Sequence, residues 1–206
     1  MAKFTVSANK AAKELSTTTK AYADAALIYY QQGDSSEEVA KKAAITIKAA
    51  NAAANTSAAE MSEYLTAVWN SYQVGADELE RYVDIMAALG AKTATSLEEI
   101  ATSMQKVAAT GNTVGVSMEQ VSSIIATVSS VTRESAESIG TSYKTIFARM
   151  GDLKLGETDE DGVGLGQVSS ALESIGIQVL DAQGQLRDMG DIVTDLGDKW
   201  QTMNGA

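Results

Sequence analysis

Several residue types are absent or scarce in this sequence. It has 206 residues with no cysteine, no histidine and no proline, and only two phenylalanines and two tryptophans. The lack of cysteine excludes disulfides and thiolate metal sites, and the lack of histidine removes the commonest general base and metal ligand. Proline breaks the hydrogen-bond ladder of a helix, so its absence fits a chain that is mostly helical.

Long apolar runs are also missing. No stretch approaches the roughly 20 apolar residues that a membrane-spanning helix needs. The run from Met1 to Val6 lacks the apolar centre of a signal peptide. We therefore expect a soluble chain that is not exported by the general route. Residues 203–206 directly follow an amphipathic run, which suggests a piece of a longer protein.

The charge is negative and uneven. The formal net charge is −11, of which residues 151–206 contribute −8 (11 acids, 3 bases) and residues 1–150 contribute −3 (16 acids, 13 bases). An acidic surface repels phosphate backbones, so direct nucleic-acid binding is disfavoured. At this length roughly 70% of the unfolded surface can be buried, which allows a sizeable core in one domain or two.

One helix–turn–helix pattern occurs twice, over residues 57–89 and 96–128, with Ser57 and Ser96 placed 39 residues apart. The aligned pairs are Ser57 with Ser96, Glu60 with Glu99, Met61 with Ile100, Leu65 with Met104, Val68 with Val107, Leu79 with Met118, Tyr82 with Val121, Ile85 with Ile124, Met86 with Ile125 and Leu89 with Val128. Repetition of apolar phase with little residue identity is typical of stacked helical hairpins. Such a scaffold needs no reactive group, so the repeat favours a structural protein over an enzyme. Only two copies are visible, which indicates the middle of one bounded domain.

Capping signals predict helices throughout residues 7–130. Residues 7–32 are predicted as one long helix, with Ala8, Ala12, Leu15, Ala26 and Tyr30 on one face and Gly33 as its left-handed stop. A Ser-x-x-Glu box, in which the serine oxygen accepts from a free amide and the glutamate reaches back, then starts a helix that runs to about Ala54. The predicted boxes and variants are Ser35–Glu38, Ser57–Glu60, Ser96–Glu99, Asp77–Glu80 and Ser117–Gln120.

The pattern changes after residue 131. A helix is predicted over 132–150, where Gly140 either weakens it or marks close packing. Residues 151–166 hold five glycines and five acids and are predicted as a loop. A short helix over 168–175, an alternating strand–turn–strand over 177–186 and a final amphipathic helix from Met189 to Trp200 complete the chain.

The predicted fold class is mainly α, with stacked helical hairpins and one small β-hairpin near the C-terminus. We divide the chain into an N-terminal helical pair (1–56), a helical-hairpin repeat domain (57–150), an acidic glycine-rich loop (151–166) and a helix/β-hairpin/helix element (167–206).

Two segments superficially suggest ligand loops. Gly162-Val-Gly164-Leu-Gly166 lacks the preceding strand, the glycine spacing and the Lys-Ser/Thr of phosphate-binding loops, so we interpret it as a flexible loop. Asp159-Glu-Asp161-Gly162 resembles the start of a calcium loop, but Val163 and Ser170 fall where ligands are needed. A solvated charge run is the better interpretation.

Catalytic chemistry has no candidate residues. Glycoside hydrolysis needs two carboxylates held a few ångströms apart, and the acids in the helices lie at cap or solvent positions. A serine nucleophile needs a positioned base, and histidine is absent. We therefore predict no catalytic, cofactor-binding or metal-binding residue and no cofactor.

The aromatic residues allow two interpretations. Tyr29-Tyr30-Gln31-Gln32-Gly33 at a helix end is either a partner-binding spot or a pair in which one ring packs on the next helix and the other covers its stem. Trp69 and Trp200 fall on apolar helix faces, where core packing is expected.

Three segments carry a resemblance to a known family. They are Tyr29-Tyr-Gln-Gln-Gly33 with the two hairpins, Thr141-Ser-Tyr-Lys-Thr-Ile-Phe-Ala-Arg149, and Leu172-Glu-Ser-Ile-Gly-Ile-Gln-Val-Leu-Asp-Ala-Gln-Gly184-Gln-Leu-Arg-Asp188, the last followed by Asp195-Leu and Trp200. In these segments the chain resembles the tail tape measure proteins of phages and prophages. The resemblance covers nearly the whole chain and is strongest over residues 85–203. The chain resembles an internal core segment of such a protein.

The resemblance implies a structural function in phage tail assembly. Such proteins set tail length inside the growing tail tube, work with tail tube subunits and tail assembly chaperones, and are later ejected with the genome. It also implies other copies of the same chain in the tube, contact with the host membrane on ejection, and a location in the virion tail or, during assembly, in the bacterial host cytoplasm.

A ruler converts residues to length, at about 1.5 Å each in a continuous helix. The frequent caps and glycine turns instead predict a compact head or junction domain of the tape measure, or a segment that refolds to enter the tube. Two alternatives stay open: a helical binding or signalling module, although Gly75, Gly90, Gly111 and Gly115 interrupt its heptads, and a cell-wall hydrolase domain.

Overall fold

The computed structural model describes residues 2–53, 55–155, 165–184 and 187–203. Within these ranges the chain is mainly helical and forms no sheet. The helices are α1 (Ala2–Glu14), α2 (Thr19–Gln31), α3 (Ser36–Ala52), α4 (Ala58–Tyr72), α5 (Ala76–Lys92), α6 (Leu97–Thr113), α7 (Met118–Thr132), α8 (Ala136–Leu155), α9 (Leu165–Ser174) and α10 (Met189–Met203).

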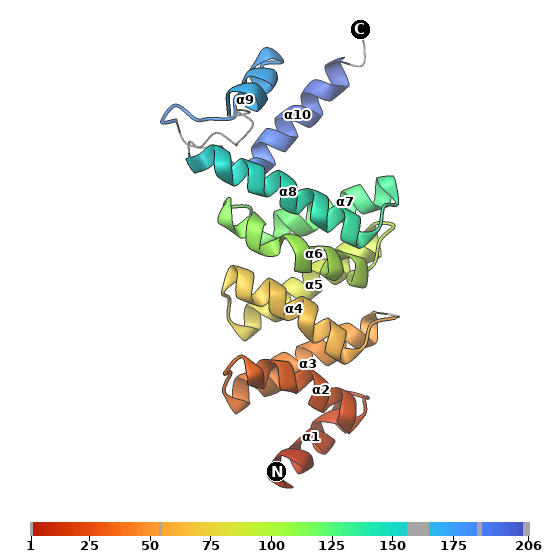
Figure 1. The fold of residues 1–206 in the computed structure, drawn as a ribbon. Coiled ribbons are helices and arrows are strands. Elements are labelled where there is room, and N and C mark those ends of the chain that lie inside the picture. The colour runs from red at the N-terminus through yellow and green to blue at the C-terminus, as the bar shows by residue number, and fades with distance from the viewer. Residues whose placement is uncertain (1, 54, 156–164, 185–186, 204–206) are drawn as a thin grey trace.

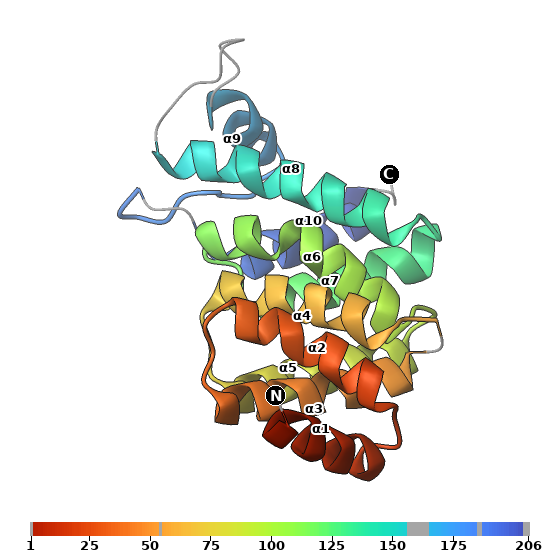
Figure 2. The same ribbon diagram turned by 60° about the horizontal axis from the view of Figure 1, so that its bottom comes forward.

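Helices α1 to α8 form a layered array (Figure 1). Helices α2, α4, α6 and α8 stack along one side, which we call the first stack, and α3, α5 and α7 stack behind them. Each hairpin returns the chain to the same side, so the helices of one stack run in the same direction (Figure 2). One buried core continues through this array from Ala8 to Phe147.

The predicted repeat is confirmed by the burial of its aligned residues. Six pairs are at most 6% exposed in both copies: Met61 with Ile100, Leu65 with Met104, Val68 with Val107, Leu79 with Met118, Tyr82 with Val121 and Met86 with Ile125. The two remaining apolar pairs, Ile85 with Ile124 and Leu89 with Val128, are half-buried in both copies. Equal burial at equal positions shows that the two hairpins occupy equivalent layers.

The array extends beyond the two copies that are visible in the sequence. The hydroxyls of Thr18, Ser57, Ser96 and Ser135 are spaced by 39 residues, and each accepts a hydrogen bond from the amide three residues further on. Helices α2, α4, α6 and α8 are therefore equivalent. Threonine at 18, and the lack of a glutamate three residues after Thr18 or Ser135, hid the outer copies from the Ser-x-x-Glu pattern.

Four of the five predicted capping boxes are confirmed, at Ser35, Ser57, Ser96 and Ser117. The variant at Asp77 is wrong, because α5 begins after Gly75 with no side-chain cap. Asp77 lies in the first turn of α5, where a carboxylate interacts favourably with the positive end of the helix dipole.

The single helix predicted over 7–32 is wrong, because the chain breaks between α1 and α2. Ser16 has a φ of 54°, and the Thr18 hydroxyl accepts from the Ala21 amide at 3.0 Å. A hydroxyl side chain satisfies the free amides of a new helix start, so this Ser-Thr-Thr run favours a restart over continuation. As a result Tyr29 is buried at 1% exposure, whereas Tyr30, placed on the buried face by prediction, is 38% exposed. The predicted stop at Gly33 is confirmed by its φ of +88°.

The helix predicted over 132–150 is α8, which begins at Ala136 and continues to Leu155. The loop predicted over 151–166 is therefore wrong at its start, and α9 begins within its end at Leu165. Residues 156–164 lie outside the described residues. The predicted short helix and final helix are confirmed as α9 and α10.

The predicted β-hairpin over 177–186 is wrong for the part of it that the structure describes; residues 185–186 lie outside. The chain does reverse, because the Gly184 amide donates to the Asp181 carbonyl at 3.0 Å and the Arg187 amide donates to the Val179 carbonyl at 2.9 Å. Ile177 and Val179 are buried together with Ile192 of α10. The alternating pattern therefore reflects packing of an extended segment on helices, since burial of every second residue does not require a second strand.

Candidate functional site

The segments that suggested ligand loops do not form a site in the structure described. Residues 159–164, which include most of both candidate loops, lie outside the described residues, and Gly166 lies in the first turn of α9. Among the described residues no three or more histidines, cysteines or acids are grouped to hold a metal ion. No described helix is both long and apolar enough to cross a membrane.

A buried lysine is the most unusual feature of the core. Lys42 of α3 has a side chain only 1% exposed, and its Nζ lies 2.6 Å from Oδ2 of Asp34, whose side chain is 17% exposed. The same Nζ lies 3.6 Å from the centre of the Trp69 ring of α4 and 5.6 Å from that of Tyr29. An ammonium over an aromatic face is attracted by the ring quadrupole. This cation therefore links the α2–α3 turn, α3 and α4.

Sequence reasoning missed this cluster, although the repeat carries a signal for it. When the buried Val39 of α3 is aligned with Leu79 of α5, Lys42 falls at the position of the buried Tyr82. The repeat that is recognisable from sequence spans only the two central hairpins, and Lys42 lies before it in α3. Trp69 is half-buried and packs on the core, as predicted, while the side chain of Trp200 is not described.

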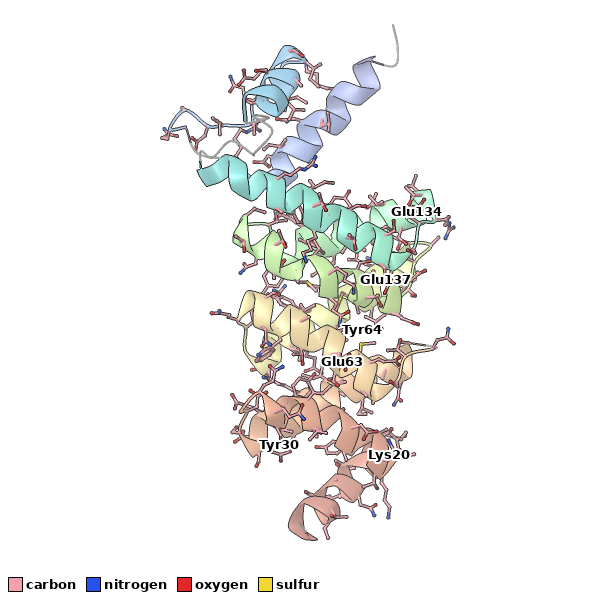
Figure 3. The ribbon with its side chains drawn as sticks, in the orientation of Figure 1. Lys20, Tyr30, Glu63, Tyr64, Glu134 and Glu137 are labelled. Atoms are coloured by element: carbon pink, nitrogen blue, oxygen red, sulfur yellow. The ribbon has the colours of Figure 1, made fainter. Side chains whose placement is uncertain are left out.

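The two tyrosines at the end of α2 have different surroundings. The Tyr29 hydroxyl lies 2.6 Å from the Thr46 hydroxyl inside the core. Burial, only partly opposed by the hydrogen bonds to threonine, raises the pKa of Tyr29 to about 12. Tyr30 faces outward (Figure 3) and lines a shallow groove with Lys10 of α1 and Val39 of α3. Tyr29 therefore packs on the next helix, as one interpretation of the sequence expected, and a partner-binding role for Tyr30 stays a prediction.

Polar contacts on the surface connect successive layers. Arg81 of α5 pairs with Glu78 at 2.7 Å and with Glu119 of α7 at 2.6 Å, and Lys48 of α3 pairs with Glu80 of α5 at 3.1 Å. Exposed pairs of this kind contribute little to stability, because solvent and salt screen the charges. Their effect is therefore chiefly on the register between layers.

The first stack is held at close range. A Cβ added to Gly140 of α8 would lie 2.7 Å from the carbonyl oxygen of Ser103 in α6 and 3.0 Å from its Cα. The Ser103 hydroxyl donates to the Ala136 carbonyl at 2.7 Å. Gly140 therefore marks close packing, which was one of the two interpretations offered by the sequence.

These contacts are suited to holding layers in register. The Lys42 charge is neutralised by Asp34 and shielded from solvent, so it is not presented to a substrate. The layer contacts, and the end faces that they leave exposed, are therefore the candidate functional surfaces of this array.

Comparison with known families gives a consistent assignment. A family model described as phage-related minor tail protein matches residues 9–206. The match covers nearly the whole sequence, and the chain therefore belongs to this family of phage tail components. No solved structure is similar enough to count as a match.

Proposed function

We propose that this member of the phage-related minor tail proteins is a segment of the tape measure that sets tail length and later leaves with the genome. The observation that carries the proposal is the regular array, in which every 39 residues, as from Ser57 to Ser96, add one layer to a continuous core. A protein of this design has an axial length that depends on the number of its repeats. The similarity of residues 85–203 to tape measure proteins supports the same conclusion.

The folded array converts residues to length inefficiently. A continuous helix of 39 residues would span about 58 Å. One layer of packed helices adds only about 8–10 Å, the usual distance between helix axes. We infer that this segment is a compact domain of the tape measure protein, or that its hairpins open when it enters the tube.

The proposed partners are tail tube subunits, tail assembly chaperones and other copies of the chain, with the host membrane as a contact on ejection. The proposed location is the interior of the tail tube. The net charge of −11 disfavours direct binding to the genome, so we expect passage with the genome without sequence-specific contact.

Deletion of one repeat from the phage gene tests the proposal. Removing residues 57–95 places Ser96 where Ser57 stood and preserves the layer spacing. Tail length, measured by electron microscopy, should fall by about 58 Å if the segment is extended in the tube, or by about 9 Å if it remains folded. Duplication of the same residues should lengthen the tail equally.

A same-length variant such as Ser57→Ala is the control and should leave tail length unchanged. Normal tail length in both the deletion and the duplication would overturn the tape measure proposal. Loss of all tails in the deletion, with lengthened tails in the duplication, would still support it.

A further inference from the structure

The two ends of the first stack, beside α1 at one end and beside α9 and α10 at the other (Figure 1), expose residues whose equivalents are buried in the interior. At one repeat position, Val68 of α4 and Val107 of α6 are fully buried, whereas Ile146 of α8 is 43% exposed. At another, Ser103 of α6 is fully buried under α8, whereas Ser142 of α8 is exposed. The outward side of α8 therefore presents the same contact surface that α6 presents to α8.

This surface, which we call the α8 face, consists of Ser138, Thr141, Ser142, Thr145 and Ile146. The corresponding residues of α6, inside the array, are Glu99, Thr102, Ser103, Lys106 and Val107. The exposed face thus carries fewer charges than its interior counterpart. Its four hydroxyl residues form the polar outer side that a terminal repeat in water normally has, but Ile146 leaves one large apolar side chain exposed on this face.

The opposite end shows the complementary feature. Ser62 of α4 and Ala101 of α6, which pack on the preceding layer, are fully buried, whereas Ala23 at the same position of α2 is only half-buried. One helical turn further on, Leu27 is 54% exposed. We call the surface formed by Lys20, Ala23 and Leu27 the α2 face.

We propose that the α2 face of one copy of this protein packs on the α8 face of another, continuing the array from copy to copy. If the layer geometry is kept, the contact of Gly140 with Ser103 and Lys106 would be repeated by Ala23 over Ser142 and Thr145. Leu27, one turn beyond Ala23, would then meet Ile146. The two exposed apolar side chains would shield each other from water.

The charges of the two ends agree with this pairing (Figure 3). Residues 1–20 contain four lysines and one glutamate, and Lys20, exposed at the start of α2, pairs with Asp24 one turn further on. Glu134 and Glu137 are exposed at the start of α8. Because the first-stack helices run in the same direction, stacking brings the start of α2 over the start of α8. Opposite charges there favour the head-to-tail arrangement over contact between two identical ends.

Such an interface joins two different surfaces, and a copy added along the layer axis leaves a free face at each end of the assembly. The inference deepens the proposed function, in which other copies of the chain are partners, but its observations are those of the two faces alone. A protein that never assembles through these faces could still belong to the tape measure, and the tail-length experiment would report that separately.

Sedimentation velocity of the 206-residue protein over a concentration series is the test. The average mass should pass that of a dimer as concentration rises, because each addition leaves one free face of each kind. Leu27→Glu and Ile146→Glu should each weaken association by about tenfold or more, since either buries a charge against an apolar side chain. Val131→Glu is the matched control, because Val131 is 77% exposed on α7 outside both faces, and it should associate like the wild type.

An equimolar mixture of Leu27→Glu and Ile146→Glu should form a one-to-one pair and nothing larger, because it retains one intact face of each kind. Circular dichroism verifies that both variants are folded. A wild type that stays monomeric at every concentration, one that stops at a closed dimer, or a mixture that behaves like the separate variants would overturn the inference.

Discussion

The first hairpin of the array (α2–α3) and the two that follow have the same layer geometry but different cores. Where the second and third hairpins have Tyr82 and Val121, the first has Lys42, paired with Asp34. Where they have Met86 and Ile125, the first has Thr46, which is hydrogen-bonded to Tyr29. The first hairpin therefore tolerates Lys42 and Thr46 in its core because each has a polar partner.

The two kinds of core stabilise the array in different ways. Apolar contacts are non-directional and roughly proportional to buried area. A buried ion pair contributes little net free energy, yet removing one partner is strongly destabilising. We therefore expect the first hairpin to be sensitive to loss of a single polar partner and the later hairpins to be sensitive to changes in shape.

The largest effect is expected when the pair in the first hairpin is broken. Asp34→Ala leaves the Lys42 ammonium buried without its carboxylate and should lower the free energy of unfolding by about 3–5 kcal/mol. Urea denaturation followed by circular dichroism measures the change. The double variant Asp34→Ala/Lys42→Met should regain most of the loss, because it removes the unpaired charge. Equal stability of Asp34→Ala and the wild type would show that the pair does not hold this core.

The next largest loss of stability is expected from a larger side chain at the contact between α6 and α8. Gly140→Ala places a methyl group 2.7 Å from the Ser103 carbonyl oxygen. Forcing tightly packed helices apart lowers the free energy of unfolding by about 1–3 kcal/mol. This loss should exceed the gain of about 1 kcal/mol that alanine brings over glycine in helix propensity. Thermal unfolding measures the result, with Ser142→Ala on the exposed side of α8 as control. A higher melting temperature for Gly140→Ala would contradict the close packing of α6 and α8.

Loss of the N-terminal cap should destabilise the second and third hairpins equally. Ser57→Ala and Ser96→Ala each remove the same reciprocal box and should each cost about 1 kcal/mol in free energy of unfolding. Chemical denaturation of the two variants in parallel is the measurement. Clearly unequal losses would mean that the second and third hairpins differ in more than their residue identities.

The smallest effect is expected at the Glu60 cap, where stability should depend on pH. Hydrogen bonds from the Ser57 side chain and amide lower the pKa of Glu60 below its usual value. The ionised carboxylate therefore stabilises the folded state above the pKa that Glu60 has when unfolded, and this contribution is lost as pH falls through the lower folded value. Glu60→Gln, which copies the non-titrating Gln120 of the α7 box, should reduce the acid dependence of the melting temperature. Identical pH profiles for this variant and the wild type would show that the cap does not titrate with folding.

Local signals could be predicted well from the sequence. The boxes at Ser35, Ser57, Ser96 and Ser117 were placed correctly, because the hydrogen bonds that define them join residues only three positions apart. The aligned apolar residues of the two central hairpins were also correct, since a helix with one buried side shows that side in its spacing.

Other features depended on residues far apart in the sequence. The break at Ser16 could not be separated from a continuous helix by alanine content alone, because a threonine cap and helix continuation compete at similar free energy. Burial of Lys42 requires Asp34 on the turn and Trp69 on the next layer, and neither can be paired with it from spacing. The alternation at Ile177 and Val179 was real, but it does not reveal whether a strand or a helix covers the buried side.

Most helix starts, and the apolar residues of the central hairpins, could be predicted from local sequence because capping and helical periodicity act within a few residues. The number of stacked layers, the tyrosine that enters the core and the exposed faces of α2 and α8 became clear only from the packed helices. Those outcomes depend on packing between different helices, where burial is set by the partner helix and not by the local sequence.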